Sequence, residues 1–469
     1  MSKKLTSVIT LVLTFALAVS SLAGCDKKQS ESDEWIESEI ISVIEDDNSS
    51  TDNSGASGSE SKQSSEGNQS ASKNSSPEKL KNPNVTVCWP KTTDDHPEFA
   101  AVNKAFEKKY GGKVTVVGTG KYDDRAARLT NLVQSKTQVD VVFTGMEDFP
   151  SYATTNLVRP IDTSKFDFSK APYDINNKKN SYTQLNGKTY FVKSDDTTGG
   201  YVLLYNKTMF ENAGLKTPAE LYKAGNWTWD TFRDAARNLT QDTNSDGKND
   251  VYGFADYDIN ALLCSNGVSL LNYDGNKFAP NTDAKVKRAY QLYYDMYNVD
   301  KSICTDPWSW STDMVQGKLG MVCQRVSQLL YWKSQTNKYE FDLAPLPKGV
   351  DAKEHYAALN YENCFAIGAT CKNADGAYAY IKFYIEQTQG KLYNEKTAGA
   401  KLSADQEKRL KEISALTANP YSPTGFGSLK NDATSLLWDI RGGKSVGSAL
   451  EFWHNVLKQD IDIALKNSK

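Results

Sequence analysis

From residue 85 onward, short apolar runs alternate with helical stretches, and this alternation is the strongest constraint on the fold. Strands are expected at Val85–Cys88, Lys113–Val117 and Asp140–Phe143. Helices are expected between them at Pro97–Lys109 and Asp123–Ser135, because apolar residues recur there at helical spacing. A β-α-β-α-β order predicts a parallel sheet with right-handed crossovers, which is an α/β fold.

In parallel sheets of this kind, ligands bind beyond the carboxyl ends of the strands. Five side chains fall just past the expected strands, namely Trp89, Asp94, Tyr122, Thr144 and Glu147. These five are named because they follow a strand. Residue type alone would not select them, since aromatic and acidic residues are common elsewhere in the chain. We therefore expect them to be candidate ligand contacts.

The alternation continues with longer helices. Tyr201–Tyr205 is expected to be a buried strand, and a helix is expected to begin at Trp227–Asp230 with Thr228 as its N-cap residue. The two tryptophans of this segment are expected to pack in the core rather than to bind ligand. Further helices are expected at Val286–Tyr297, Ala374–Glu386 and Val446–Leu465.

Charge is unevenly spread along the chain. The net charge is −3, of which residues 1–25 contribute +2 and residues 26–83, with 13 acids and 6 bases, contribute −7. This leaves +2 on residues 84–469, with no run of lysine and arginine among them. A nucleic-acid-binding protein needs a concentrated basic face, so we expect no nucleic-acid partner.

The first 25 residues are expected to be a lipoprotein signal peptide. Lys3 and Lys4 precede an apolar stretch from Leu5 to Val19, which is short for a bilayer span and typical of a secretory signal. The segment Leu22–Cys25 resembles the bacterial lipobox, in which the cysteine is acylated and becomes the new N-terminus. The resemblance implies lipidation of Cys25 and a location on the extracellular face of the bacterial cytoplasmic membrane.

Residues 26–83 are expected to form a disordered, acidic, serine-rich linker. From Asn48 to Ser76, 12 of 29 residues are serine and none is Val, Leu, Ile or aromatic. Such a segment cannot bury enough apolar area to offset its loss of conformational entropy. The segment Trp35–Ile44 has apolar residues at i, i+4 and i+8, which fits either a short amphipathic helix or an apolar disordered stretch.

Motifs that mark common enzyme active sites are missing from the sequence. It contains no Gly-x-Ser-x-Gly, His-Glu-x-x-His, Cys-x-x-Cys or Gly-x-x-x-x-Gly-Lys segment. Paired carboxylates could cleave glycosides, but Asp and Glu are too common for their presence to indicate this. We expect a protein that is not an enzyme, and an anchored carbohydrate-active enzyme stays an alternative.

Several short segments, in order along the chain, resemble the family 1 extracellular solute-binding proteins of ABC importers, the maltose-binding-protein-like group. Each segment is short, and their order makes the resemblance specific over about residues 84–469. The segments are Asp140–Phe143, Asn156–Asp162, Gly187–Tyr190, Leu204–Lys207, Asn226–Asp230, Gln316–Met321 and Ala344–Gly349.

This resemblance implies a two-lobed, periplasmic-binding-protein-like fold of type II with hinge strands. The N-terminal lobe would comprise residues 84–203 plus 359–395, and the C-terminal lobe residues 204–358 plus 396–469. The chain would first cross between the lobes near Val202–Asn206, return near Leu359–Ile367 and cross again near 390–400. The implied function is a monomeric receptor, without a cofactor, that delivers a solute to ABC permease subunits coupled to a cytosolic ATPase.

A sugar or oligosaccharide is the expected solute, and a non-sugar solute such as a peptide stays an alternative. An aromatic ring that covers about 100 Å² of a pyranose face gives about 2.5 kcal/mol, and polar groups fix the hydroxyls. The polar loop Asp306–Ser311 offers Trp308 and Trp310 as platforms. The polar candidates are Arg325, after an expected strand, and Tyr361 and Glu362 near the return crossing.

Residues 242–250 resemble part of a calcium-binding loop. Asp242, Asn244, Asp246 and Asp250 stand at oxygen-ligand positions, and Lys248 could offer its backbone carbonyl. The expected bidentate glutamate at position 12 is replaced by a glycine. The segment is therefore either a weak structural calcium site or a turn between a helix and a strand.

Overall fold

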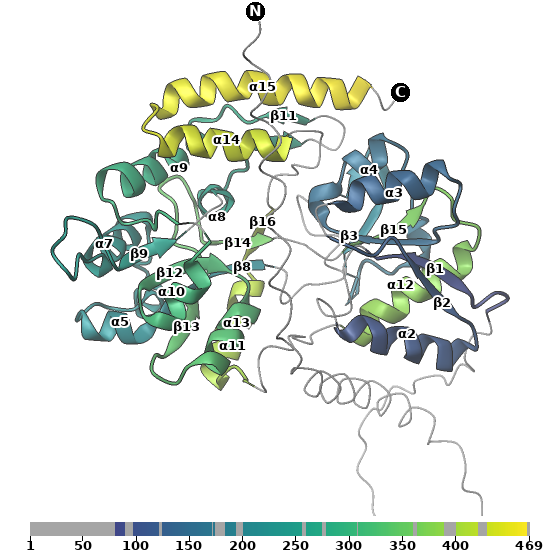
Figure 1. The fold of residues 1–469 in the computed structure, drawn as a ribbon, viewed down its shortest axis with the longest axis horizontal. Coiled ribbons are helices and arrows are strands. Elements are labelled where there is room, and N and C mark those ends of the chain that lie inside the picture. The colour runs from purple at the N-terminus through teal and green to yellow at the C-terminus, as the bar shows by residue number, and fades with distance from the viewer. Residues whose placement is uncertain are drawn as a thin grey trace, which may run out of the picture. The chain divides into compact units, whose positions relative to one another are not determined.

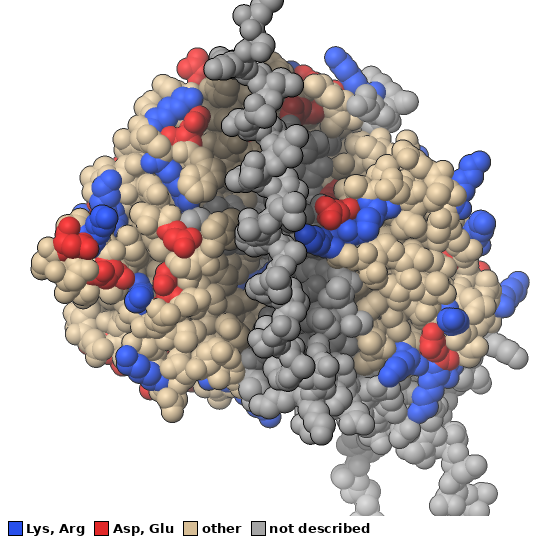
Figure 2. All heavy atoms as spheres, in the orientation of Figure 1, with Lys and Arg blue, Asp and Glu red and all other residues tan. Residues whose placement is uncertain are grey.

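The structure, a computed structural model, describes residues 80–89, 97–121, 124–170, 172–173, 183–193, 200–255, 259–273, 278–306, 308–359, 364–388, 400–420 and 429–466. Residues 1–79, with the expected signal peptide and nearly all of the expected linker, lie outside this range. Among the described residues, no helix combines the length and the apolar character that a membrane span requires. On the face that Figure 2 shows, basic and acidic side chains are interspersed.

The first sheet has the strand order β2-β1-β3-β15-β4, with β7 also paired to β15. Its parallel centre confirms the expected topology, because β1 pairs in parallel with both β2 and β3. β15 runs antiparallel to β3 and arrives from far downstream in the chain. The strands are β1 (Val85–Cys88), β2 (Val114–Val117), β3 (Val141–Thr144), β4 (Val158–Arg159), β7 (Phe191–Lys193) and β15 (Cys364–Gly368).

Helices flank this first sheet (Figure 1). On the expected first helix, Val102 and Phe106 are fully buried one turn apart, as an amphipathic helix packed on a sheet requires. The helices are α2 (Pro97–Tyr110), α3 (Arg125–Gln134), α4 (Ser151–Thr154) and α12 (Ala374–Thr388), with the short helix η2 (Met146–Asp148) after β3. α12 packs against α2 and against the strands β1 and β15.

The second sheet has the strand order β16-β14-β8-β12-β9, with β13 also paired to β8. β8 runs antiparallel to β12, β13 and β14, while β12 is parallel to β9. The strands are β8 (Gly200–Asn206), β9 (Tyr252–Ala255), β12 (Leu319–Gln324), β13 (Phe341–Ala344), β14 (Tyr356–Leu359) and β16 (Thr417–Pro420).

Helices also surround the second sheet (Figure 1). Trp227 and Trp229 are buried, as expected, and their indole nitrogens donate to Pro345 O (2.8 Å) and Ser265 Oγ (2.9 Å). The helices are α5 (Lys207–Asn212), α6 (Pro218–Lys223), α7 (Trp229–Leu239), α8 (Asn260–Ser265), α9 (Ala284–Tyr294), α10 (Trp310–Gln316), α11 (Val326–Gln335), α13 (Ala404–Ser414), α14 (Leu429–Arg441) and α15 (Val446–Lys466).

The sheets show where the chain changes lobe. β7 belongs to the first sheet and β8 wholly to the second, so the first change lies within residues 194–199 rather than near Val202–Asn206. The expected boundary at residue 203 therefore falls inside a strand. Downstream, β14 belongs to the second sheet and β15 to the first, and the expected return near Leu359–Ile367 stays a prediction.

Candidate functional site

The carboxyl ends of the first sheet meet at one edge. β15 begins at this edge, since Cys364 pairs with both Thr144, the end of β3, and Lys193, the end of β7. The parallel strand β1 ends there too, at Cys88. The loops that follow these strands are the ones that carry the candidate contacts expected from the sequence.

A corresponding edge exists in the second sheet. β12 ends there at Gln324, opposite Val202 near the start of β8. β14 also ends there, because Leu359 pairs with Gly200, the first residue of β8. Two connections join the edges, from Lys193 to Gly200 and from Leu359 to Cys364.

The lengths of these connections limit how far apart the two edges can be. The four residues between Leu359 and Cys364 span at most about 18 Å, and the six residues between Lys193 and Gly200 at most about 25 Å. Both connections leave one carboxyl edge and enter the other. The candidate site therefore consists of two sets of loops. One set follows the carboxyl edge of the first sheet, and the other follows the carboxyl edge of the second sheet.

The first lobe contains a buried ion pair between the start of α3 and the end of η2. Arg125 donates from Nε (2.5 Å) and Nη2 (2.9 Å) to the two carboxylate oxygens of Asp148, and Arg125 is 9% exposed. Thr144 also donates its hydroxyl to Asp148. The start of α3 is thus tied to the end of β3 and to η2, which are the segments next to Tyr122 and Glu147.

Tyr152 completes this buried network. Its burial, followed by the neighbouring carboxylate of Asp148, raises the pKa of the phenol well above its usual value. The phenol therefore stays protonated near neutral pH. Sequence reasoning named Thr144 but missed Arg125, Asp148 and the buried Lys193 at the end of β7. For Asp148 and Lys193, the available sign was their position at or just after a strand end, and Arg125, at the start of α3, had no such sign.

On the second lobe, Trp308 lies in an exposed position near the carboxyl edge. Ile303 forms a parallel bridge with Phe254 of β9, so the chain leaves this bridge at the carboxyl end of the sheet. Trp308 follows five residues later and is 77% exposed, with its backbone N–H donating to Asp306 Oδ1 (2.9 Å). Trp308 is thus a large, mostly exposed apolar side chain that follows this bridge in the chain.

Arg325 lies at the same edge. It follows the last residue of β12 and is the N-cap residue of α11, with a partly buried side chain. Its carbonyl accepts a hydrogen bond from the backbone N–H of Gln328 (3.0 Å). Gln324 beside it is 5% exposed. The structure therefore brings Trp308 and Arg325, both named from the sequence, to one edge.

The structure reassigns Trp89 from the candidate site to the core. It is fully buried, with its ring stacked against Phe99 (centroids 3.8 Å apart) and Phe143 (3.7 Å apart). Because other rings cover the indole, it has no open face for a sugar. Trp310 is also a packing residue, since it meets Trp332 edge-to-face at 6.1 Å and joins the core beside α11.

Several expected contacts cannot be placed against this geometry. Asp94, Tyr122, Tyr361 and Glu362 lie outside the described residues, as does the side chain of Glu147. They stay predictions.

The expected calcium loop is closed by its own hydrogen bonds. Asp242 accepts from the backbone N–H groups of Asp246 (3.2 Å) and Gly247 (2.8 Å), and Asp246 accepts from that of Lys248 (2.8 Å). Asp250 accepts from the backbone and hydroxyl of Thr243. Within the described residues no three acidic, histidine or cysteine side chains converge as a metal site would require. Of the two alternatives, this geometry favours the turn, and the effect of calcium on stability distinguishes them.

The comparisons with known proteins agree with this architecture. A family model described as bacterial extracellular solute-binding protein matches residues 89–391. A relative from Brucella abortus (strain 2308), named only as a binding protein, is 24% identical over 305 residues, which cover 62% of this chain and 69% of the relative.

Two solved structures show the same two-lobed fold, that of the type II periplasmic binding proteins. An ABC substrate-binding protein from Listeria monocytogenes, in complex with cycloalternan, has a TM-score of 0.61 and 16% identity, covering 81% of this chain and 99% of its own. A maltose/maltodextrin-binding domain from Bdellovibrio bacteriovorus, bound to maltotriose, has a TM-score of 0.57 and 17% identity, covering 81% and 100%.

Proposed function

Because the chain belongs to the bacterial extracellular solute-binding protein family, we propose that it is a receptor that binds a sugar or oligosaccharide and passes it to an ABC importer. The observation that carries the proposal is Trp308, which is 77% exposed at the carboxyl edge of the second sheet. The relatives from Listeria monocytogenes and Bdellovibrio bacteriovorus, which share its fold, were solved with cycloalternan and maltotriose.

The chemistry of the two edges suits a neutral polyhydroxylated ligand. The ring of Trp308 can cover the apolar C–H face of a pyranose, and burial of about 100 Å² there stabilises the complex by about 2.5 kcal/mol. Arg325 at the same edge supplies donors for hydroxyl groups. Discrimination between sugars then comes from polar groups that are left unpaired by the wrong epimer.

Closure of the two lobes is the proposed mechanism. A ligand held by both carboxyl edges favours the closed form only by the difference in its affinity for the closed and open forms. The chain passes from β7 to β8 and from β14 to β15, strands of different sheets, and these two connections would absorb the change in backbone angles. The protein would release its ligand unchanged, since a receptor needs no nucleophile–base pair.

Anchoring completes the proposal. The segment Leu22–Cys25 supports acylation of Cys25, and residues 26–83 would then form the linker between the lipid and the two lobes. Treated as a flexible coil, the 29 residues from Asn48 to Ser76 span about 30 Å. This would let the lobes reorient toward the permease subunits while the protein stays at the extracellular face of the membrane.

Calorimetric titration of the purified protein with neutral mono- and oligosaccharides tests the proposal. At least one sugar should bind with micromolar or tighter affinity, and chromatography should return it intact. Binding of none of the sugars, with binding of a peptide or an acidic solute instead, would overturn the sugar assignment. Cleavage of the oligosaccharide would identify an enzyme in place of a receptor.

A further inference from the structure

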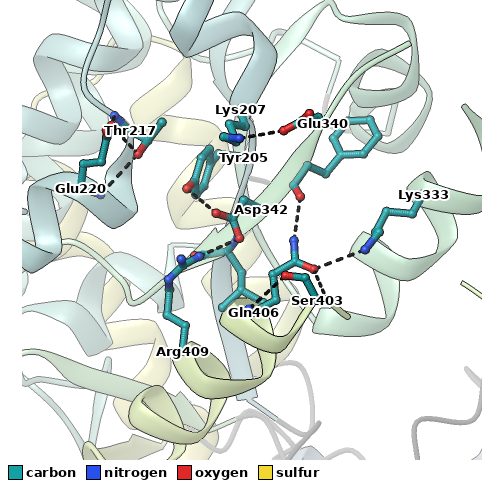
Figure 3. Close-up of polar contacts among 12 residues, drawn as sticks. Tyr205, Lys207, Thr217, Glu220, Lys333, Glu340, Asp342, Ser403, Gln406 and Arg409 are labelled. Carbon is teal, nitrogen blue, oxygen red and sulfur yellow. Dashed lines mark hydrogen bonds and ion pairs between the residues drawn. The ribbon is translucent and has the colours of Figure 1, made fainter. Parts of the chain in front are cut away.

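A groove of about 710 Å³ lies on the second lobe. Figure 3 shows the polar contacts among residues that line it. Its walls come from α5 and α6, from the residues between α11 and β13, and from the start of α13. Cavities of about 300–1,000 Å³ are the usual size for small-ligand sites. Neither the family resemblance nor the carboxyl edges account for this groove.

The groove lies at the opposite end of β8 from the candidate site. β8 begins at Gly200, at the carboxyl edge, and Tyr205 and Lys207 at its far end line the groove. A strand rises about 3.3 Å per residue, so roughly 17–23 Å separates the two ends. A mono- or disaccharide bound at the candidate site would not reach the groove.

Three polar side chains form a fixed floor. Asp342 accepts one hydrogen bond from the hydroxyl of Tyr205 (2.9 Å) and another from Nη1 of Arg409 (2.7 Å). Tyr205 is 1% exposed, and burial followed by the nearby Asp342 raises the pKa of its phenol. Arg409 also donates from Nη1 to the carbonyl of Leu343 (2.9 Å). These three side chains therefore hold their positions without a ligand.

Arg409 in the floor has N–H groups that can donate hydrogen bonds to a ligand. A guanidinium has five N–H donors, and the hydrogen bonds of Arg409 to Asp342 and Leu343 both come from Nη1. On the rim, Nζ of Lys333 donates to Lys401 O (2.6 Å) and Gln406 Oε1 (3.3 Å). Asn337, which also lines the groove, is exposed. The lining thus contains both hydrogen-bond donors and acceptors.

The lining carries five acids, Glu211, Glu220, Glu340, Asp342 and Asp405, against Lys207, Lys333 and Arg409, and the more buried of these charges are compensated. Lys207 bonds Glu340 (2.7 Å) and lies 3.4 Å from Glu211, and Arg409 is paired with Asp342. Glu220 accepts from the backbone and hydroxyl of Thr217 at the start of α6. A charged ligand would therefore find no buried, uncompensated counter-charge among these groups. A neutral ligand that both donates and accepts hydrogen bonds fits them better.

Apolar groups complete the lining. Leu215, Ala219 and Phe341 face the same space as the polar groups, and Phe341 is 4% exposed. A sugar ring presents hydroxyls at its edge and C–H groups on its faces, so it matches a wall of mixed character. We propose that this groove is a second site for a neutral oligosaccharide, separate from the receptor site between the carboxyl edges.

The first experiment measures stoichiometry by calorimetric titration of the full chain, with maltotriose and mannotriose as probes up to millimolar concentration. Two sites per chain are expected, one tight and one weak. Ala219→Trp fills the groove without removing a charge, and Arg409→Gln removes donors from its floor. Each should weaken the second site at least tenfold, the loss expected for a hydrogen bond to a charged group, and leave the tight site unchanged.

Two matched control variants distinguish a loss of binding in the groove from a general effect of substitution on the lobe. Ala224→Trp places the same ring at the exposed C-terminal end of α6, outside the groove lining. Arg288→Gln breaks a comparable arginine–aspartate pair, to Asp351, elsewhere on the lobe. Both controls should keep two sites.

The outcomes distinguish this proposal from the receptor proposal. A single site that is insensitive to Ala219→Trp and Arg409→Gln would overturn the groove and leave the receptor standing. A single weak site that is lost in these variants would support the groove and contradict the receptor. A second site that survives Ala219→Trp would also overturn the groove. Absence of binding for both trisaccharides would overturn the groove, whereas the receptor proposal is decided by the wider panel of mono- and oligosaccharides.

Discussion

The guanidinium of Arg125 and the carboxylate of Asp148 form a buried two-bond ion pair that joins the start of α3 to the end of η2. Buried ion pairs contribute little net stability compared with apolar residues of the same volume, because desolvation of both charges offsets their attraction. The clearer consequence here is geometric. The pair fixes the spacing of two segments that border the proposed ligand site.

A double-mutant cycle tests this pair. Arg125→Met leaves the carboxylate of Asp148 buried without its cation, and we expect a loss of about 3–5 kcal/mol in the free energy of unfolding. Arg125→Met combined with Asp148→Leu should lose less, since no buried charge is left over. Urea unfolding measures both values. Equal losses for the single and double variants would contradict this account of the pair.

Trp308→Ala should weaken sugar binding without affecting the fold. Loss of about 100 Å² of stacking corresponds to about 2.5 kcal/mol, or roughly 70-fold in affinity. The side chain is 77% exposed, so the free energy of unfolding should change by less than about 0.5 kcal/mol. Calorimetry and thermal unfolding provide the two measurements. Trp438→Ala, on the 51% exposed Trp438 of α14, is the control and should leave affinity unchanged.

Calcium should leave the melting temperature unchanged. Asp242 and Asp246 in the loop after α7 already accept hydrogen bonds from backbone N–H groups of that loop. Asp242→Ala should lower the melting temperature equally in EDTA and in millimolar calcium, because it removes turn contacts rather than a metal ligand. Stabilisation of the unsubstituted chain by calcium, and its loss in Asp242→Ala, would instead identify a metal site.

Stability should fall as the pH drops below about 6.5. Burial lowers the pKa of both His355 and His454 from the usual 6.5. In the window below 6.5 the unfolded chain takes up protons that the folded chain does not, so the free energy of unfolding decreases until the folded pKa values are reached. Urea midpoints at pH 7.5 and 5.5 measure the difference. His454→Leu should reduce it, and an unchanged pH dependence in that variant would exclude His454 as a contributor.

Local patterns predicted the elements of the first lobe well, because each depends on its own residues. The expected strand Val85–Cys88 and helix Pro97–Lys109 match β1 and α2 within a residue. The insertion of β15 beside β3 could not be predicted in this way, since pairing between residues more than 200 positions apart leaves no local periodicity. Sheet membership of β8 was missed for the same reason.

The candidate site was harder to predict, because burial decides the role of an aromatic residue. Trp308 and Trp310 share one polar loop, yet Trp308 is exposed and Trp310 packs against Trp332. Nothing in the loop sequence distinguishes them. The difference arises from where α10 begins, which places Trp310 against Trp332 of α11, more than twenty positions downstream.

Trp89 provides the sharpest contrast with Trp308. Its ring is fully buried against Phe99, Phe143 and, at 5.9 Å, Tyr384 of α12. Trp89→Ala should therefore cost about 3–5 kcal/mol in the free energy of unfolding, the usual range for removal of a buried aromatic side chain, and Trp89→Phe should cost less. Urea unfolding gives these values. Titration of the folded variants should show sugar affinity close to that of the unsubstituted protein, whereas a large loss of affinity with little loss of stability would return Trp89 to the ligand site.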